Sequence, residues 1–192
     1  METWEIQAKV RKSERLLKDV GLAATRGDAR AVANAIAKIG GLVNAVRRAL
    51  SAAKKGPAAS VAAYRQLALN FAAATTIGAP GSTAAHIAEG RVAHVDCNFG
   101  TPDADTIAGV EARARFWHET MLKIGKLEAT TPEEAELKKA QLRHYGELFG
   151  TEQTMLERAM DRAKEGGFEA LLPAIEKALT ALLPLGEGVD VP

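Results

Sequence analysis

A regular seam of apolar residues runs through the segment from about Ala29 to Lys54 and limits what this chain can fold into. The seam recurs in steps of alternately four and three residues, through Val32, Ile36, Ile39, Val43, Val46, Leu50 and Ala53. This spacing keeps the side chains on one face of a helix and is typical of lengthwise helix–helix packing. A similar helix is predicted at about Thr3–Thr25, and Gly27 and Asp28 suit a short turn between the two. The sequence therefore predicts an N-terminal antiparallel, coiled-coil-like hairpin.

Composition extends this prediction to the whole chain. Alanine makes up 38 of the 192 residues, whereas only 5% are aromatic. Alanine is the best helix former and is poor in strands. We therefore predict an all-α protein, a helical bundle of about five to six helices.

The middle of the chain is predicted to hold one central helix and one long irregular loop. The helix, at about Ala58–Thr75, has almost no charged residue and little polar face, so it should be buried on most sides. The stretch Thr76–Gly100 contains four glycines and one proline and is predicted to be irregular, with one short helix at about Ser82–Glu89. A loop of this length inside a compact domain is uncommon and often functional.

Three more helices are predicted in the C-terminal half. The first, at about Thr101–Leu127, would begin with Thr101 as cap and Pro102 at the first helical position. The second begins at Thr131, where Glu134 completes a capping box, and Gly150 is a candidate break. The third, at Gly167–Leu183, is expected to end at Pro184, before a tail over residues 185–192.

Charge divides the chain into three parts, which we expect to form one compact domain. Residues 1–55, the predicted basic hairpin, carry a net charge of +7. Residues 56–100, the predicted central apolar helix and irregular loop, carry equal numbers of positive and negative charges, so their net charge is zero. Residues 101–192, the predicted acidic C-terminal helices, carry −6.

The hairpin should concentrate positive charge at one level. Folding at the turn places Lys9, Arg11 and Lys12 level with Arg47 and Arg48. We call these five residues the basic patch and predict that it binds an anionic partner. An acidic protein surface is favoured, including the C-terminal helices of the same chain or of a second copy. Nucleic acid is an alternative partner. A membrane is an unlikely partner, because every long stretch without a charged residue also contains polar residues and helix-breaking glycine or proline.

Four side chains in the predicted loop suggest a metal or catalytic site. His86, His94, Asp96 and Cys97 are the donor types that zinc accepts. Alternatively, Cys97 is a nucleophile whose thiol pKa is lowered by His94. The spacing matches no established zinc motif, and the competing interpretation is a buried free cysteine beside polar loop residues.

A second candidate metal site lies across two predicted C-terminal helices. Glu111 and His118 share one helix face, and His144 and Glu147 lie at a similar height on the next helix. Two carboxylates and two imidazoles facing each other can hold a metal in a bundle. The competing interpretation is that His118 is a boundary residue of the core.

Taken together, these patterns favour a non-enzymatic helical interaction, adaptor or assembly protein without a cofactor. A single cysteine fits a reducing compartment, and the acidic segment Met1–Glu5 does not resemble a secretory signal, so a cytoplasmic location is expected. The alternative function is an enzyme or zinc-binding protein that uses the central loop around His94 and Cys97. Self-association is expected from the division of charge.

Overall fold

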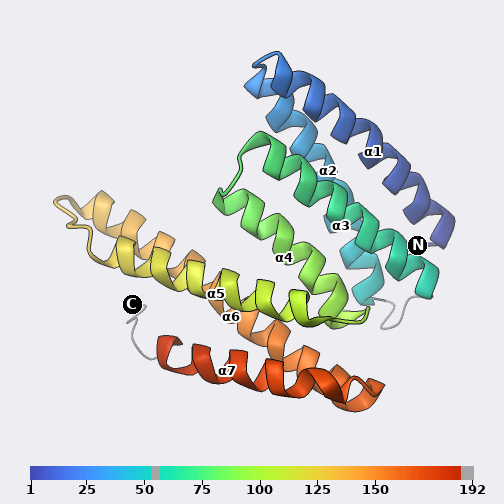
Figure 1. Ribbon diagram of the computed structural model, residues 1–192. Coiled ribbons are helices and arrows are strands. Elements are labelled where there is room, and N and C mark those ends of the chain that lie inside the picture. Colours follow the sequence, from blue (N-terminus) through green and yellow to red (C-terminus); the bar gives the residue numbers. More distant parts are fainter. Residues whose placement is uncertain (53–56, 187–192) are drawn as a thin grey trace. The chain divides into compact units, whose positions relative to one another are not determined.

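The computed structural model describes residues 1–52 and 57–186, and in these ranges every regular element is helical (Figure 1). The prediction of an all-α protein is therefore confirmed. The elements are α1 (Thr3–Thr25), α2 (Ala29–Ala52), α3 (Ala58–Gly78), α4 (Thr83–Asn98), α5 (Ala104–Gly125), α6 (Pro132–Gly166), the 3-10 turn η1 (Glu169–Leu171) and α7 (Leu172–Gly186). None of the described helices is both long and apolar enough to cross a membrane.

The chain divides into two compact units, Met1–Thr101 and Pro102–Pro192. The division nearly coincides with the change in charge along the sequence. The first unit carries a net charge of +7 and the second −6. Each unit therefore has its own core and its own electrostatic character.

Helix α3 is the centre of the first unit, since it contacts α1, α2 and α4 (Figure 1). Tyr64, Leu67 and Ala68 of α3 are fully buried. They belong to one hydrophobic cluster with Ile6 of α1 and with residues of α2 and α4, of which Val95 is the α4 member. A helix without a polar face has to be covered in this way, because its apolar surface would otherwise remain in water.

A small polar cluster interrupts the apolar contact between α1 and α3. The amide of Asn70 donates to the hydroxyl of Ser13 at 2.8 Å, and that hydroxyl donates to the backbone carbonyl of Val10 at 2.7 Å. Gln66 donates to the Asn70 side-chain oxygen at 3.0 Å. Ser13 and Asn70 are both buried, and buried polar groups of this kind are tolerated only when hydrogen-bonded.

The predicted hairpin is present as two packed helices joined by a tight turn. Gly27 has a φ of +69°, which favours glycine, and the Asp28 carboxylate accepts the Ala31 amide at 2.9 Å as a helix cap. Helix α3 packs against both α1 and α2, so their seams are shared among three helices. Coiled-coil geometry stays a prediction. The last seam residue, Ala53, and Lys54 lie outside the described residues.

The prediction of a long irregular central loop is wrong. Helix α3 continues to Gly78, and after a turn at Gly81 the helix α4 covers residues 83–98. The Ser82 hydroxyl accepts the Ala85 amide at 3.2 Å and caps α4, which extends beyond the short helix predicted there. The buried positions of α4 hold small residues such as Gly90 and Ala93 together with Asp96, so they give no clear apolar pattern in the sequence.

The second unit consists of α5, α6 and α7, and its helix boundaries differ from those predicted. Helix α5 is capped by Asp103, whose carboxylate accepts the Thr106 amide at 2.7 Å, so it begins after Thr101 and Pro102. The capping box of Thr131 and Glu134 at the start of α6 is confirmed.

Two predicted interruptions in this unit are absent. Helix α6 runs through Gly150 without a break, because the Thr151 hydroxyl donates to the Glu147 carbonyl at 2.7 Å instead of capping a new helix. Helix α7 passes Pro184 and ends at Gly186. Proline near a helix end removes few hydrogen bonds, which explains why it does not end the helix where expected. The expected tail is partly helical at its start, and its residues 187–192 lie outside the described residues.

Two glycines give a direct test of packing in the first unit. A Cβ at Gly78 would lie 2.7 Å from Ile36 Cδ1 and 2.9 Å from Val32 Cγ1, whereas a Cβ at Gly41 would meet nothing within 4 Å. We expect Gly78→Ala to lower the free energy of unfolding by about 1 kcal/mol through overpacking. Gly41→Ala, the control, should raise it by roughly 0.5 kcal/mol through helix propensity. Urea unfolding followed by circular dichroism measures both, and changes of the same sign would contradict this packing.

Candidate functional site

The basic patch of the first unit is formed by two packed helices. Lys9, Arg11 and Lys12 lie on α1, and Arg47 and Arg48 lie on α2. The flanking core residues belong to one hydrophobic cluster, formed by Ile6 and Val10 of α1 with Val43, Val46 and Leu50 of α2. The two groups of basic residues therefore occur at the same level of the helix pair.

The charges of the basic patch are not neutralised by carboxylates of the described chain. None of its five side chains forms an ion pair with a described residue. Several carboxylates of the same unit have structural partners: Asp28 caps α2, Glu5 completes the cap of α1, and Asp96 pairs with Arg65. Among the described residues, the carboxylates of the first unit therefore leave the basic patch without an ion-pair partner.

Arg47 differs from its neighbour Arg48 in its surroundings. Arg48 is exposed, whereas Arg47 is half-buried, and its charge acts on the ionisation of Tyr64 on α3. Arg91 of α4 is also half-buried, and its charge acts on the ionisation of the same phenol. Neither Arg47 nor Arg91 forms a hydrogen bond or ion pair with any residue the structure describes.

Tyr64 is the most unusual polar side chain of this cluster. It is fully buried, and its hydroxyl has no hydrogen-bond partner among the described residues. Burial raises the pKa of Tyr64 to about 12, although the charges of Arg91 and Arg47 act in the opposite direction. Burial and the like charge of Arg47 lower the pKa of Arg91. The three side chains thus present donors and positive charge without an acceptor.

All four residues predicted to form a central-loop site lie on α4, and three of them have polar partners on α4 or α3. His86 pairs with Glu89 at 3.3 Å, and the Asn98 amide lies 3.2 Å from Nδ1 of His94. Asp96 accepts Arg65 Nε at 2.7 Å and Nη2 at 3.1 Å. Cys97 is fully buried, which gives a substrate no route to a nucleophilic thiol.

The second predicted constellation is likewise distributed among separate contacts. Glu111 pairs with Arg115 at 2.8 Å, and the His118 ring packs near Phe149 with a centroid distance of 6.3 Å. His144 and Glu147 are exposed on α6. Across residues 1–52 and 57–186, no group of three or more His, Cys, Asp or Glu side chains is placed to hold a metal ion. The described geometry therefore gives no support to either predicted metal site.

Sequence reasoning missed a buried ion pair in the second unit. Arg113 of α5 donates from Nε to Glu152 of α6 at 2.9 Å and from Nη2 at 3.1 Å, and the Trp117 indole donates to Glu152 at 3.3 Å. Both charged residues are buried. The only signal in the sequence is that Arg113 and Glu152 occupy positions with core spacing, next to Ala114 and one turn before Leu156.

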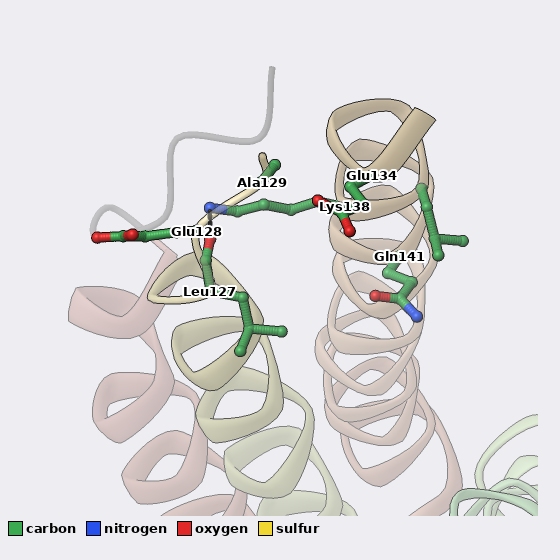
Figure 2. Close-up of a pocket in the computed structure, with 7 residues that line it drawn as sticks. Leu127, Glu128, Ala129, Glu134, Lys138 and Gln141 are labelled. Atoms are coloured by element: carbon green, nitrogen blue, oxygen red, sulfur yellow. Dashed lines mark hydrogen bonds between the residues drawn. The ribbon is translucent and has the colours of Figure 1, made fainter. Parts of the chain in front are cut away.

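Two further pockets lie among the described residues. One, of about 170 Å³ beside the α5–α6 connection, is shown in Figure 2. Its lysine, Lys138, donates to the carbonyls of Gly125 and Leu127 at 2.7 Å each and so caps α5. The other, of about 400 Å³, is an apolar groove where the α1–α2 turn meets the end of α3 at Ile77 and Gly78. In the first pocket the charged residues Glu134 and Lys138 are engaged in helix capping, and the second pocket is lined by apolar and small residues.

Comparisons with protein-family models, with curated proteins and with solved structures find no match for this chain.

The buried Arg113–Glu152 ion pair predicts that replacing one partner lowers the free energy of unfolding much more than replacing both. Arg113→Met should lower the free energy of unfolding by about 3 kcal/mol, because it leaves the Glu152 charge buried without a partner. The double variant Arg113→Met/Glu152→Met should cost much less. Arg115→Met, which removes an exposed pair, should change stability by less than about 1 kcal/mol. Denaturant unfolding followed by tryptophan fluorescence measures all three; equal effects of Arg113→Met and Arg115→Met would refute the burial.

Tyr64 predicts a distinct alkaline transition. Its pKa of about 12 in the folded chain exceeds the ordinary value of 10.0, so its contribution to stability is complete below pH 10 and is lost as pH rises toward 12. Near-ultraviolet absorbance of tyrosinate should show one ionisation in this range coupled to loss of structure. Tyr64→Phe should remove that step, and Tyr145→Phe should retain it. The opposite pattern would show that Tyr64 is accessible to solvent.

Proposed function

We propose that this protein is a non-enzymatic helical interaction protein, an adaptor or assembly component, whose first unit binds an acidic protein surface through the basic patch. The observation that carries the proposal is that the five patch residues form no ion pair with the described chain. Partners of opposite charge attract each other before contact, which raises the association rate and disfavours unsuitable partners. The expected cytoplasmic location is part of this proposal.

A second copy of the chain is one partner with suitable charge. Residues 102–192 carry −6, so association between copies would bring opposite charges together. Nucleic acid is less favoured, because the five patch residues include no aromatic side chain to stack on bases. The alternative function, an enzyme or zinc-binding protein using His94 and Cys97, has no specific observation in its favour, and the burial of Cys97 opposes it.

Binding of the full-length chain to poly-L-glutamate and to duplex DNA, at low and high salt, tests this proposal. We expect poly-L-glutamate to bind at low salt and to dissociate as salt is added. Arg11→Glu/Arg48→Glu should weaken this binding by about tenfold or more, equivalent to about 1.4 kcal/mol. Failure of the wild-type chain to bind poly-L-glutamate at low salt would refute the proposal.

The matched control changes net charge equally at another place. Arg30→Glu/Lys38→Glu alters two exposed residues of α2 outside the patch and should retain most of the binding. Equal losses in the two double variants would mean that only net charge matters. Tighter binding of DNA than of poly-L-glutamate at the same salt would favour the nucleic-acid alternative. A native mass spectrum of each variant shows whether the bound partner is a second copy.

A further inference from the structure

We propose that Arg47, Arg91 and Tyr64 form a binding site for one phosphate monoester group. This inference goes beyond the proposed function, because the site is separate from the exposed part of the basic patch and can take a small molecule. Each residue comes from a different helix of the first unit: Arg47 from α2, Tyr64 from α3 and Arg91 from α4.

The core of the first unit brings these three residues together. Val46, Tyr64 and Val95 belong to the same hydrophobic cluster. Arg47 follows Val46 directly, and Arg91 precedes Val95 by about one helical turn. Both guanidinium groups lie close enough to the Tyr64 phenol to act on its ionisation. Apolar packing of α2, α3 and α4 therefore brings the three side chains to one region of the first unit.

The site contains donors that nothing in the described chain satisfies. The Tyr64 hydroxyl is buried and has no hydrogen-bond partner, which costs free energy unless an acceptor is supplied. The two arginines offer several N–H donors and have no hydrogen-bond acceptor. They remain charged at all ordinary pH values. An anion is the chemical group that complements all three side chains.

Like-charge repulsion adds a second reason for an anion. Partial burial disfavours the charged form of Arg91 and lowers its pKa, and the like charge of Arg47 acts in the same direction. A pair of half-buried arginines without a carboxylate is unfavourable in the empty chain. A bound anion between them would convert this repulsion into two attractive contacts.

A phosphate monoester fits this arrangement better than a carboxylate. Its charge at neutral pH, about −1.5 to −2, matches that of two arginines. It also has three acceptor oxygens, whereas a carboxylate has two in one plane and suits a single guanidinium in a bidentate pair, as Arg65 and Asp96 illustrate here. Three donor groups from three helices require acceptors in three directions.

Access to the site depends on the arginine side chains. Both are half-buried, so solvent reaches part of each, whereas the phenol lies fully inside. We expect the phosphate to contact the two guanidinium groups first and the Tyr64 hydroxyl to donate to it once the arginine side chains turn around the ligand. Arg47 and Arg91 thus supply most of the affinity, and Tyr64 positions the group.

Thermal unfolding and calorimetric titration of the full-length chain test the site, with phenyl phosphate as probe and chloride at the same ionic strength as reference. A ligand that binds only the folded state raises the melting temperature. We expect phenyl phosphate to raise it and chloride to leave it unchanged. Arg47→Gln and Arg91→Gln should each weaken binding by about tenfold or more, and Tyr64→Phe by about threefold to tenfold.

Arg30→Gln is the matched control, because it removes an exposed arginine of α2 that lies outside both the site and the basic patch. It should bind phenyl phosphate as the wild type does. Without ligand, Arg91→Gln should melt no lower than the wild type, since it relieves repulsion, so loss of binding is separable from loss of folding. Wild-type affinity in Arg91→Gln, equal losses in Arg47→Gln and Arg30→Gln, or no binding by the wild type would overturn the proposal.

Two further probes identify the source of the phosphate. Inorganic phosphate that binds as well as phenyl phosphate points to a free phosphate or small phosphorylated molecule. A phosphoserine peptide that binds more tightly than inorganic phosphate, and much more tightly than its unphosphorylated form, points to a phosphorylated protein. Because Arg11→Glu/Arg48→Glu leaves this site intact, failure of the phosphate site and failure of poly-L-glutamate binding are distinguishable.

Discussion

The burial of α3 is the constraint on which the first unit depends. This helix has one charged residue, Arg65, and apolar or small residues on nearly every face, so three other helices have to cover it. Covering it brings residues that are distant in the sequence to one place. Tyr64, Val46 and Val95 meet for this reason, and the arginines beside the two valines are carried with them.

Arginine has two contrasting roles in this chain. Arg65 and Arg113 each form a bidentate ion pair with a carboxylate on another helix. Each pair fixes its two helices to each other at a defined point. Arg47 and Arg91 occupy comparable positions at the edge of a core but have no such carboxylate. Because a carboxylate pairs with the buried Arg113 and with the more exposed Arg65, the absence of one beside Tyr64 in the described chain is informative about what the site receives.

The sequence allowed the fold class and several helix ends to be predicted, because these depend on local features. The seam of α2, the turn at Gly27 and the capping box at Thr131 all act within a few residues. Only the first half of helix α4 was predicted, because its buried positions are mostly small residues and Asp96, with Val95 as the one large apolar side chain. Of the residues in the proposed phosphate site, only Arg47 was predicted from the sequence to bind an anion, as part of the basic patch. Arg91 and Tyr64 could not be found without the packing of three helices.

The hydrogen bond between Asn70 and Ser13 has a consequence for specificity. Apolar seams can slide past each other by one helical turn, about 5.4 Å, with only small losses of contact. A buried polar pair opposes such slippage, since any other alignment leaves both polar groups in an apolar layer without this hydrogen bond. The hydrogen bond therefore favours one axial alignment of α1 against α3. By fixing the axial position of α1 against α3, which also packs on α2, it helps to keep Lys9, Arg11 and Lys12 level with Arg47 and Arg48, so a neutral contact inside the core contributes to the charge pattern outside.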